Sequence, residues 1–574
     1  MPQIIEAAEA EPAEAVPPAP PAAPQWQHRS RKRRRSRSAR AKRKGLSWQR
    51  LWRRSRRWAP RIGLVAALGA LIAFFPADWL RLAIMATFPD RPAFACDIRE
   101  WAESSLGAKP AQPPGTLTLV VARLHGDADG AATAAVNRTL RGQPGWRLRQ
   151  ACRGLDTEGA EATNRLAQHD VQALLQQRGG DLLLWGEATD ARALRFRFVG
   201  RGLSPRADAA PFALDRGLLA GRPPDVAATA LTVVALAAGA SADTARGRQA
   251  VASLQQRLPE LEALVASPPP GLTVAQRQDL AWAEAQGVQA LGEHAADLTA
   301  LARAAEQWWN LSGTLDQRES PDAWAGAQYN LGTTLAKAGQ QGDRTKLEAA
   351  VAAFQRASQA WTRDRAPRDW AMTQTSLGTV LATLGDRAGN TVRLAEGVAA
   401  YSQALEVYSR ERTPQDWAMT QNNLGIALAT LGNREGDPAK LESAVVAYRE
   451  ALREWTQDRA PLAWAATQHN LAATLRVLGA RARDVPRLEA AAEAYHAALR
   501  EWTRDRMPDL WAQTMESLAV TGEVLAALGG GVPRLQEALT DAEAALDEYR
   551  RAGAEGPITR SEALVGRLRA KLPG

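Results

Sequence analysis

The sequence predicts a mainly α-helical protein, in which an α-solenoid of helical hairpins is preceded by a small α/β domain and a single transmembrane helix. Three observations lead to this prediction. Tryptophan, proline, leucine and tyrosine positions recur at a fixed spacing in the C-terminal half. Strand-like and helix-like segments alternate before them, and near the N-terminus an apolar run follows a strongly basic segment.

The basic character of the chain belongs to one segment. Seventeen Lys and Arg residues lie between Arg29 and Arg61 and only four acidic residues precede them, so residues 1–61 carry a net charge of +13 and the remaining residues carry −3. Residues 1–25 are rich in Pro, Ala and Glu, a composition typical of disorder. A basic segment either binds nucleic acid or contacts anionic lipid beside a membrane span, and the apolar run that follows favours lipid.

That apolar run covers 14 residues, 62–75. Trp58 and Trp79 flank it 21 residues apart. This separation is roughly 30 Å along a helix, the thickness of the hydrocarbon core of a bilayer. Tryptophan at both ends is typical of membrane spans. We therefore predict a transmembrane helix over residues 58–79; the alternative is a buried core helix.

The charge asymmetry also predicts an orientation, because positive residues beside a span remain on the cytoplasmic side. The 64 arginines against eight lysines, together with the high alanine content, indicate a GC-rich bacterial genome. The prediction is a single-pass protein of the bacterial inner membrane, with a cytoplasmic N-terminus and a periplasmic C-terminal body.

Composition divides the chain into seven segments. They are a disordered tail that is Pro- and Ala-rich and then basic (1–57), the transmembrane helix (58–79), an interfacial helix and linker (80–115), a small α/β domain (116–200), a helical connector (201–275), the repeats (276–552) and a C-terminal helix or tail (553–574). Within the connector, helices are predicted over 225–240 and 241–257, and three prolines at 268–270 mark a break.

The α/β domain is predicted from alternating segments. Strand-like runs cover 116–123, 146–152, 181–188 and 193–200, and helical patterns cover 129–142 and 159–179. The element order and the motif Leu184-Trp185-Gly186-Glu187 resemble the amino-terminal α/β domain of TolB and of FlgO-like envelope proteins. The resemblance implies that this domain mediates protein interaction.

Residues 125–130 are the most site-like stretch of that domain. Asp127 and Asp129 have the spacing of a calcium loop, but the further acidic ligands of such a loop are missing. The simpler interpretation is a Gly/Asp turn in which Asp129 caps the following helix. Cys96 and Cys152 are the only cysteines, so they either form one disulfide or remain two thiols.

The repeats are the clearest feature of the sequence. Five tryptophans lie 46, 47, 47 and 47 residues apart, and leucine, proline and aromatic positions keep the same frame, which indicates an array of structural repeats. In each copy a proline begins a first helix, a Leu-Gly pair ends it, and a second helix follows. The recurring positions are Trp324, Trp370, Trp417, Trp464 and Trp511; Pro321, Pro367, Pro414, Pro461 and Pro508; Phe354, Tyr401, Tyr448 and Tyr495; and the glycines Gly385, Gly432 and Gly479.

These copies resemble tetratricopeptide repeats (TPR). Leu424-Gly425 match the family's pair in the first helix, and Ala444, Tyr448 and Ala451 match its pattern in the second. The copies depart from the family in length, because its period is 34 residues and the period here is about 47. A degenerate first copy covers 277–322, and the last copy, from residue 509, is expected to cap the array.

The resemblance implies that the first helices line a concave face. The candidates for binding the backbone of an extended peptide are polar residues in the first helix, just before the leucine that Leu424 represents in its copy. The alternative is that they form hydrogen bonds within or between hairpins. The recurring tryptophans are expected to be core residues. The candidate peptide-binding residues are Gln328, Asn330, Gln374, Ser376, Gln421, Asn423, Gln468 and Asn470.

Motifs of catalysis do not appear in the sequence: no phosphate loop, dinucleotide fingerprint, nucleophile elbow or paired metal-ligand histidines. We therefore expect no enzyme, no cofactor and no metal. The predicted function is a membrane-anchored scaffold whose solenoid binds peptide segments or protein partners. The alternatives are a sensor, in which the α/β domain binds a ligand and the repeats relay it, and nucleic-acid binding through the basic tail.

Overall fold

The computed structural model describes residues 117–127, 130–141, 143, 146–154, 175, 180–188, 193–200, 212–220, 225–242 and 244–573. The tail, the transmembrane helix predicted over 58–79, the interfacial helix, the linker and Cys96 lie outside these residues. Among the helices that the structure describes, none combines the length and apolarity that a bilayer span requires.

A five-stranded mixed sheet begins the described part of the chain. Its strand order is β2-β1-β3-β4-β5, with β1 parallel to β2 and β3, and with β4 antiparallel to β3 and β5. The fifth strand lies beyond residue 200 and was not predicted from the sequence. It is only four residues long, too short to show a clear alternating pattern. The helix predicted over 159–179 lies outside the described residues except for Leu175. The elements are β1 (Leu117–Arg123), α4 (Ala131–Leu140), β2 (Trp146–Gly154), β3 (Leu182–Glu187), β4 (Ala193–Gly200) and β5 (Phe212–Asp215).

Gly186 allows β3 and β4 to approach closely. A Cβ atom placed on Gly186 would lie 1.9 Å from the carbonyl oxygen of Arg195 on the paired strand. We expect Gly186→Ala to lower the free energy of unfolding by about 2 kcal/mol, because the two backbones must separate. Denaturation followed by circular dichroism measures this loss. Gly566→Ala is the control, since its Cβ meets nothing within 4 Å and alanine favours a helix; an equal loss in both variants would contradict the steric argument.

Three helices connect the sheet to the repeats: α6 (Arg216–Ala220), α7 (Asp225–Gly239) and α8 (Ala245–Ala266). Helix α7 is buried along nearly its whole length, because it contacts β3 and β4 as well as α8 and the first repeat helix. Helix α8 runs nine residues beyond the predicted end at 257, through Pro259, and ends just before the predicted proline break.

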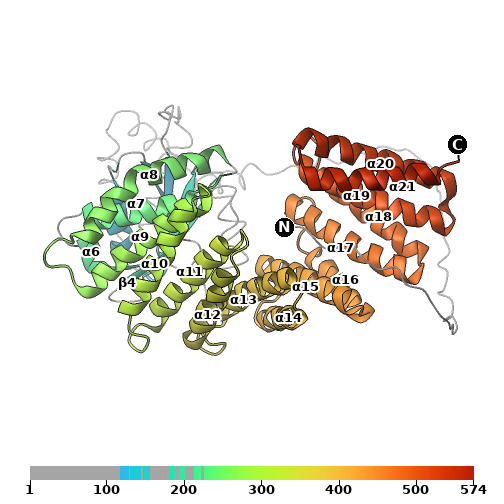
Figure 1. Cartoon of the computed structure of the whole chain (residues 1–574). Helices are drawn as coiled ribbons and strands as arrows, with labels where there is room; N and C mark the ends of the chain where they lie inside the picture. Colours follow the sequence, from blue (N-terminus) through green and yellow to red (C-terminus); the bar gives the residue numbers. More distant parts are fainter. Residues whose placement is uncertain are drawn as a thin grey trace, which may run out of the picture. The chain divides into compact units, whose positions relative to one another are not determined.

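The repeats form six helical hairpins followed by one further helix (Figure 1). We call the first helix of each hairpin its A helix and the second its B helix. Each of the five predicted prolines begins an A helix. The A/B pairs are α9 (Val274–His294) and α10 (Leu298–Thr314), α11 (Pro321–Gly339) and α12 (Arg344–Ala360), α13 (Pro367–Ala388) and α14 (Thr391–Leu405), α15 (Pro414–Glu435) and α16 (Pro438–Ala451), α17 (Pro461–Ala482) and α18 (Val485–Leu499), and α19 (Pro508–Leu525) and α20 (Gly531–Ala552); η1 (Ala526–Gly530) joins the last pair, and α21 (Glu555–Lys571) follows it.

The prediction that a Leu-Gly pair ends the A helix is wrong by about one turn in α13, α15 and α17. Gly385 lies inside α13, which continues to Ala388 and ends against Gly389 in the left-handed conformation. The physical reason for Gly385 is close packing, because a Cβ there would lie 2.7 Å from the backbone nitrogen of Leu394 on the B helix. Gly432 and Gly479 contact the same part of their own B helices.

The aromatic residue predicted in each B helix packs on the glycine of its A helix. A Cβ on Gly332, Gly378 or Gly425 would lie 2.7 to 3.0 Å from the ring of Phe354, Tyr401 or Tyr448. The glycine therefore lets an aromatic ring fit between the two helices of one hairpin.

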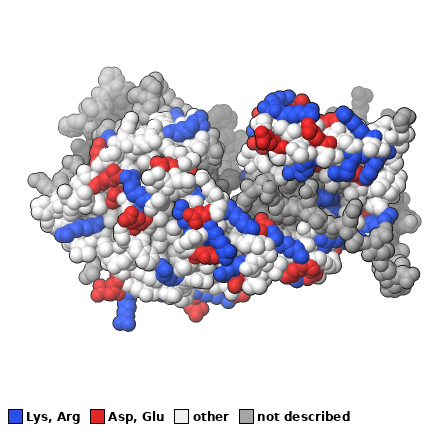
Figure 2. All heavy atoms as spheres, in the orientation of Figure 1, with Lys and Arg blue, Asp and Glu red and all other residues white. Residues whose placement is uncertain are grey.

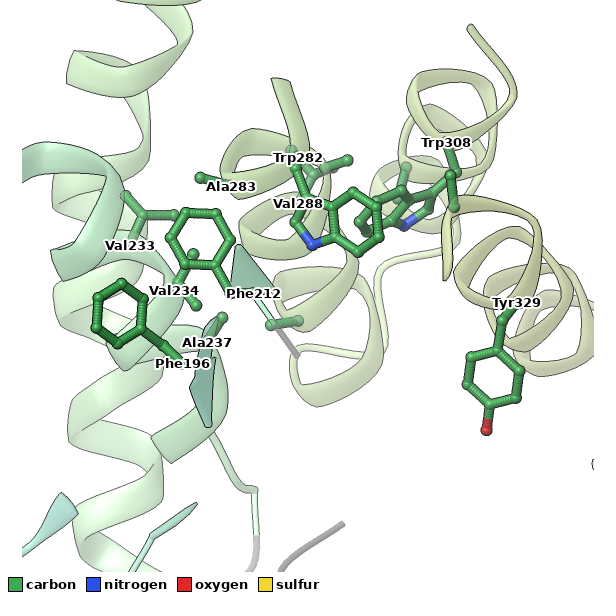
Figure 3. Packing of buried hydrophobic residues seen from close by; sticks show 14 of the residues in the cluster. Phe196, Phe212, Val233, Val234, Ala237, Trp282, Ala283, Val288, Trp308 and Tyr329 are labelled. Carbon is green, nitrogen blue, oxygen red and sulfur yellow. The ribbon is translucent and has the colours of Figure 1, made fainter. Parts of the chain in front are cut away.

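One hydrophobic cluster extends from the sheet into the third hairpin. Figure 3 shows Phe196 and Phe212 of the sheet packed against α7, with Trp282, Trp308 and Tyr329 of the first repeats beyond them. Trp282 and Trp308 make an edge-to-face contact with ring centroids 5.0 Å apart. The sheet and the first hairpins therefore share a continuous core. Smaller clusters join the later hairpins to one another.

Candidate peptide-binding face

All eight predicted peptide-binding residues lie on A helices. Consecutive A helices from α9 to α19 contact each other, so residues at equivalent positions of neighbouring copies lie close together. The structure divides the eight residues into a buried group and a half-buried group. Gln328, Asn330 and Gln374 are buried, and Ser376, Gln421, Asn423, Gln468 and Asn470 are half-buried.

Two of the buried amides hydrogen-bond between hairpins. Gln328 donates from Nε2 to Oγ of Ser312 on the preceding B helix at 3.1 Å, and Gln374 repeats this bond to Ser358 at 3.4 Å. The side chains of these two glutamines therefore join one hairpin to the next, which is the alternative to peptide binding.

Ser376 shares a hydrogen bond with the Tyr329 hydroxyl at 3.1 Å, and the asparagines among the half-buried residues keep hydrogen-bonding capacity. Asn470 donates from Nδ2 to Asn422 at 3.4 Å, and Asn423 accepts a bond of the same length from Asn422. Bonds this long are weak, and an asparagine amide has two donors and two acceptor sites. We call the half-buried residues at one repeat position, Ser376, Asn423 and Asn470, the amide face; Gln421 and Gln468, two residues before Asn423 and Asn470, lie on another side of α15 and α17.

A column of polar contacts, which was not predicted from the sequence, joins successive A helices. Each contact links residues 45 apart, as in the bond from Thr467 Oγ1 to Asn422 Oδ1 at 3.2 Å. The available signal was the recurrence of Thr420, Thr467 and Thr514 in the repeat frame. The other contacts are Thr375 with Thr420 at 3.3 Å, His469 with Thr514 at 3.1 Å, and Ser561 with Glu516 at 3.0 Å.

The last of these contacts shows what α21 does. Ser561 lies 47 residues after Thr514 and takes its place in the column, so α21 occupies the position of a seventh A helix. Its buried side carries Leu564, Val565 and Leu568, and its other side is polar and exposed. An amphipathic terminal helix of this kind covers the apolar end of a repeat array.

The arginines in the loops after the A helices are helix-end features. Arg387 donates to the carbonyl oxygen of Gly339, at the end of the preceding A helix, at 2.9 Å. Arg434 binds Asp386 and Arg481 binds Asn433 in the equivalent places. A cation at a helix C-terminus meets unpaired carbonyl groups and the negative end of the helix dipole, so these bonds stabilise the stacking of hairpins.

The middle of the A helices carries almost no charge. Between their first and last turns, α11, α13 and α15 hold no acidic or basic residue, and α17 holds Arg476 and His469. Burial, with a smaller effect of Arg476, lowers the pKa of His469 to about 4, so this imidazole is neutral at pH 7. On the face shown in Figure 2, Lys and Arg lie among Asp and Glu residues.

The low pKa of His469 predicts acid sensitivity. The unfolded chain binds a proton near pH 6.5 and the folded chain near pH 4, so stability is complete above pH 6.5 and falls as pH drops between these values, by up to about 3 kcal/mol. His469→Asn, which copies Asn422 of the preceding repeat, should remove this loss. Urea denaturation at pH 7 and pH 4.5 measures it. His496→Asn, at an exposed position, should leave the pH dependence unchanged; a wild-type slope in His469→Asn would refute the assignment.

The stretch at residues 125–130 forms a helix cap. The carboxylate of Asp127, which is buried, accepts bonds from the backbone nitrogens of Ala132 and Thr133 and from the Thr133 hydroxyl. Asp127 therefore bonds to the first turn of α4, and Asp129, for which a cap was predicted, lies outside the described residues. In the described part of the chain no three His, Cys, Asp or Glu side chains are grouped as metal ligands.

No protein-family model matches the chain, and no curated protein matches it either. One similar solved structure is a Rap protein complexed with competence and sporulation factor. It has 10% sequence identity and a TM-score of 0.30, and the match covers 61% of this chain and 88% of that chain. A similarity this low supports no assignment of ligand, and the description of the fold rests on the helices themselves.

Proposed function

We propose that the protein is a membrane-anchored scaffold whose solenoid binds extended peptide segments of protein partners on the amide face. The observation that supports this proposal is the repetition of half-buried polar groups at one position of α13, α15 and α17, within helix middles that carry almost no charge. Packed helices lie about 8–10 Å apart, which is close to the rise of three residues in an extended peptide. Successive amides can therefore bond every third peptide unit.

The anchor and its orientation are part of the same proposal. The apolar run flanked by Trp58 and Trp79 would hold the protein in the bacterial inner membrane, the basic tail would contact anionic lipid on the cytoplasmic side, and the body would be periplasmic. Alkaline phosphatase fused to the C-terminus tests the orientation, since it is active only in the periplasm. An inactive but intact fusion would overturn the orientation.

The function is proposed to be non-catalytic. The sheet domain, by its resemblance to TolB and FlgO-like domains, would add a second surface for protein partners. The sensor alternative lacks a comparable observation, because the Asp127 carboxylate is used within its own turn.

Selection of a random peptide library on the full chain in lipid nanodiscs tests the binding. Enriched peptides should lose about tenfold in affinity when Asn423 and Asn470 are both replaced by alanine, because each amide contributes about 0.5–1.5 kcal/mol. Ser402→Ala with Gln403→Ala, on the exposed side of α14, is the matched control. Failure to enrich any peptide, or equal affinity in the double variant, would overturn the proposed site.

A further inference from the structure

Arg476 departs from the pattern of the repeats. It lies in the middle of α17, where the equivalent positions of the three preceding A helices hold Ala336, Ala382 and Ala429. It is the single Lys or Arg between the first and last turns of α11, α13, α15 and α17. The fold therefore forms three times with a small apolar residue at this place and does not require a cation there.

The surroundings of Arg476 hold no neutralising charge. Its Nε atom is buried without a hydrogen-bond partner, and no ion pair of Arg476 occurs within the described residues. Burial raises the pKa of the Tyr495 hydroxyl, and the nearby Arg476 and Ser517 side chains lower it by less. His469 lies near it and is neutral at pH 7. A half-buried guanidinium thus faces a tyrosine, a serine and an uncharged imidazole.

A cation in such a place is unfavourable unless something pairs with it. Partly removing a guanidinium from water is costly, and a neutral tyrosine oxygen returns less than a carboxylate does. A residue that weakens its own helix packing, at a position where alanine suffices, is typical of a functional site. The missing partner is an anion, and in a peptide the anion that the planar guanidinium matches is a carboxylate.

We infer that Arg476 binds the carboxylate of an Asp or Glu side chain in the peptide segment that the amide face holds. The inference rests on the proposed function, because Arg476 lies six residues, about 9 Å along α17, from Asn470 of that face. The rest of the face is uncharged, so it binds backbone groups of any sequence. Arg476 then supplies the selectivity: it sets which peptide residue lies over α17 and requires that residue to be acidic.

The test compares peptides selected from one random library on the full chain and on two variants. Peptides enriched on the wild type should share an Asp or Glu at one aligned position, and Arg476→Ala should weaken their binding about 10- to 100-fold. Arg476→Glu should instead enrich Lys or Arg at that position. Arg449→Ala, which removes an exposed arginine from α16, is the control and should preserve the acidic preference.

The outcomes separate this inference from the function on which it rests. Enriched peptides without a shared acidic position, or with equal affinity for wild type and Arg476→Ala, would overturn the role of Arg476 and leave peptide binding intact. No enrichment on any variant would overturn the proposed function itself. Circular dichroism checks the fold of each variant, and Arg476→Gln, which keeps a polar group of similar length, replaces Arg476→Ala if the latter unfolds.

Discussion

Replacing Trp308 with alanine is expected to lower the free energy of unfolding by about 3–5 kcal/mol. Trp308 on α10 has no exposed surface, makes an edge-to-face contact with Trp282, and donates from Nε1 to Gln289 at 2.8 Å. The substitution leaves a cavity the size of an indole and an unpaired amide oxygen. Because Trp308 belongs to the cluster that joins the sheet to the repeats, the substitution should destabilise both the sheet and the first hairpins.

The neighbouring tryptophan is the matched control. Trp309 is 54% exposed and lies against the guanidinium of Arg356, so Trp309→Ala should cost about 1 kcal/mol or less. Urea denaturation followed by circular dichroism compares the two variants, since tryptophan fluorescence would average 19 indoles. Equal losses would show that the continuous core does not determine stability.

Hydrogen exchange distinguishes a local loss from a shared one. If the sheet and the first hairpins unfold together, Trp308→Ala should increase exchange in β1, β3 and α7 as well as in α9 and α11. Unchanged protection in the sheet, with exchange raised only in the repeats, would contradict a common unfolding unit.

The arrangement of the repeats was predictable from the sequence because stacked hairpins demand the same residue at the same place in every copy. The proline positions predicted where A helices begin, and the aromatic positions predicted the ring that packs on Gly425 and its equivalents. The same pattern misplaced the ends of α13, α15 and α17, because a glycine is needed both at helix ends and at close helix contacts. Only the three-dimensional structure shows that Gly385 approaches the backbone of Leu394.

The division of the amides was not predictable. Gln374 and Gln421 occupy equivalent positions, yet the first is buried and bonded to Ser358 and the second is half-buried. The difference comes from the preceding B helix. The residue 16 positions earlier is Ser358 on α12 for Gln374, but Leu405 on α14 for Gln421. Periodicity predicts that residues share a position, but the contacts at that position depend on residues about 16 earlier in the chain, which vary between copies.

Replacing Glu516 with alanine is expected to release α21 from the end of the array. The buried carboxylate of Glu516 accepts bonds from Arg560 at 3.0 and 2.9 Å, from Ser561 at 3.0 Å and from Tyr549 at 3.2 Å. Its removal takes the carboxylate from Arg560, which is 45% exposed, and the acceptor from two hydroxyl groups, a loss of about 2–3 kcal/mol. Because α21 contacts mainly α20 and α19, this loss falls on the last helix of the array rather than on the inner hairpins.

Hydrogen exchange over residues 555–571 measures the release, and protection there should disappear while α13 and α15 stay protected. Glu562→Ala is the matched control, since its ion pair with Arg550 at 2.6 Å is exposed and contributes less than about 1 kcal/mol.

Glu516→Gln separates charge from shape in this contact. Glutamine at 516 keeps an oxygen that can accept the Ser561 bond, as Asn422 accepts the bond of Thr467 earlier in the column, but it cannot neutralise Arg560. If the charge holds α21, Glu516→Gln should lose protection almost as fully as Glu516→Ala. The polar column joins all consecutive A helices from α13 onward. Wild-type protection in Glu516→Gln would mean that the contact of this column, without the charge of Glu516, is enough to hold α21.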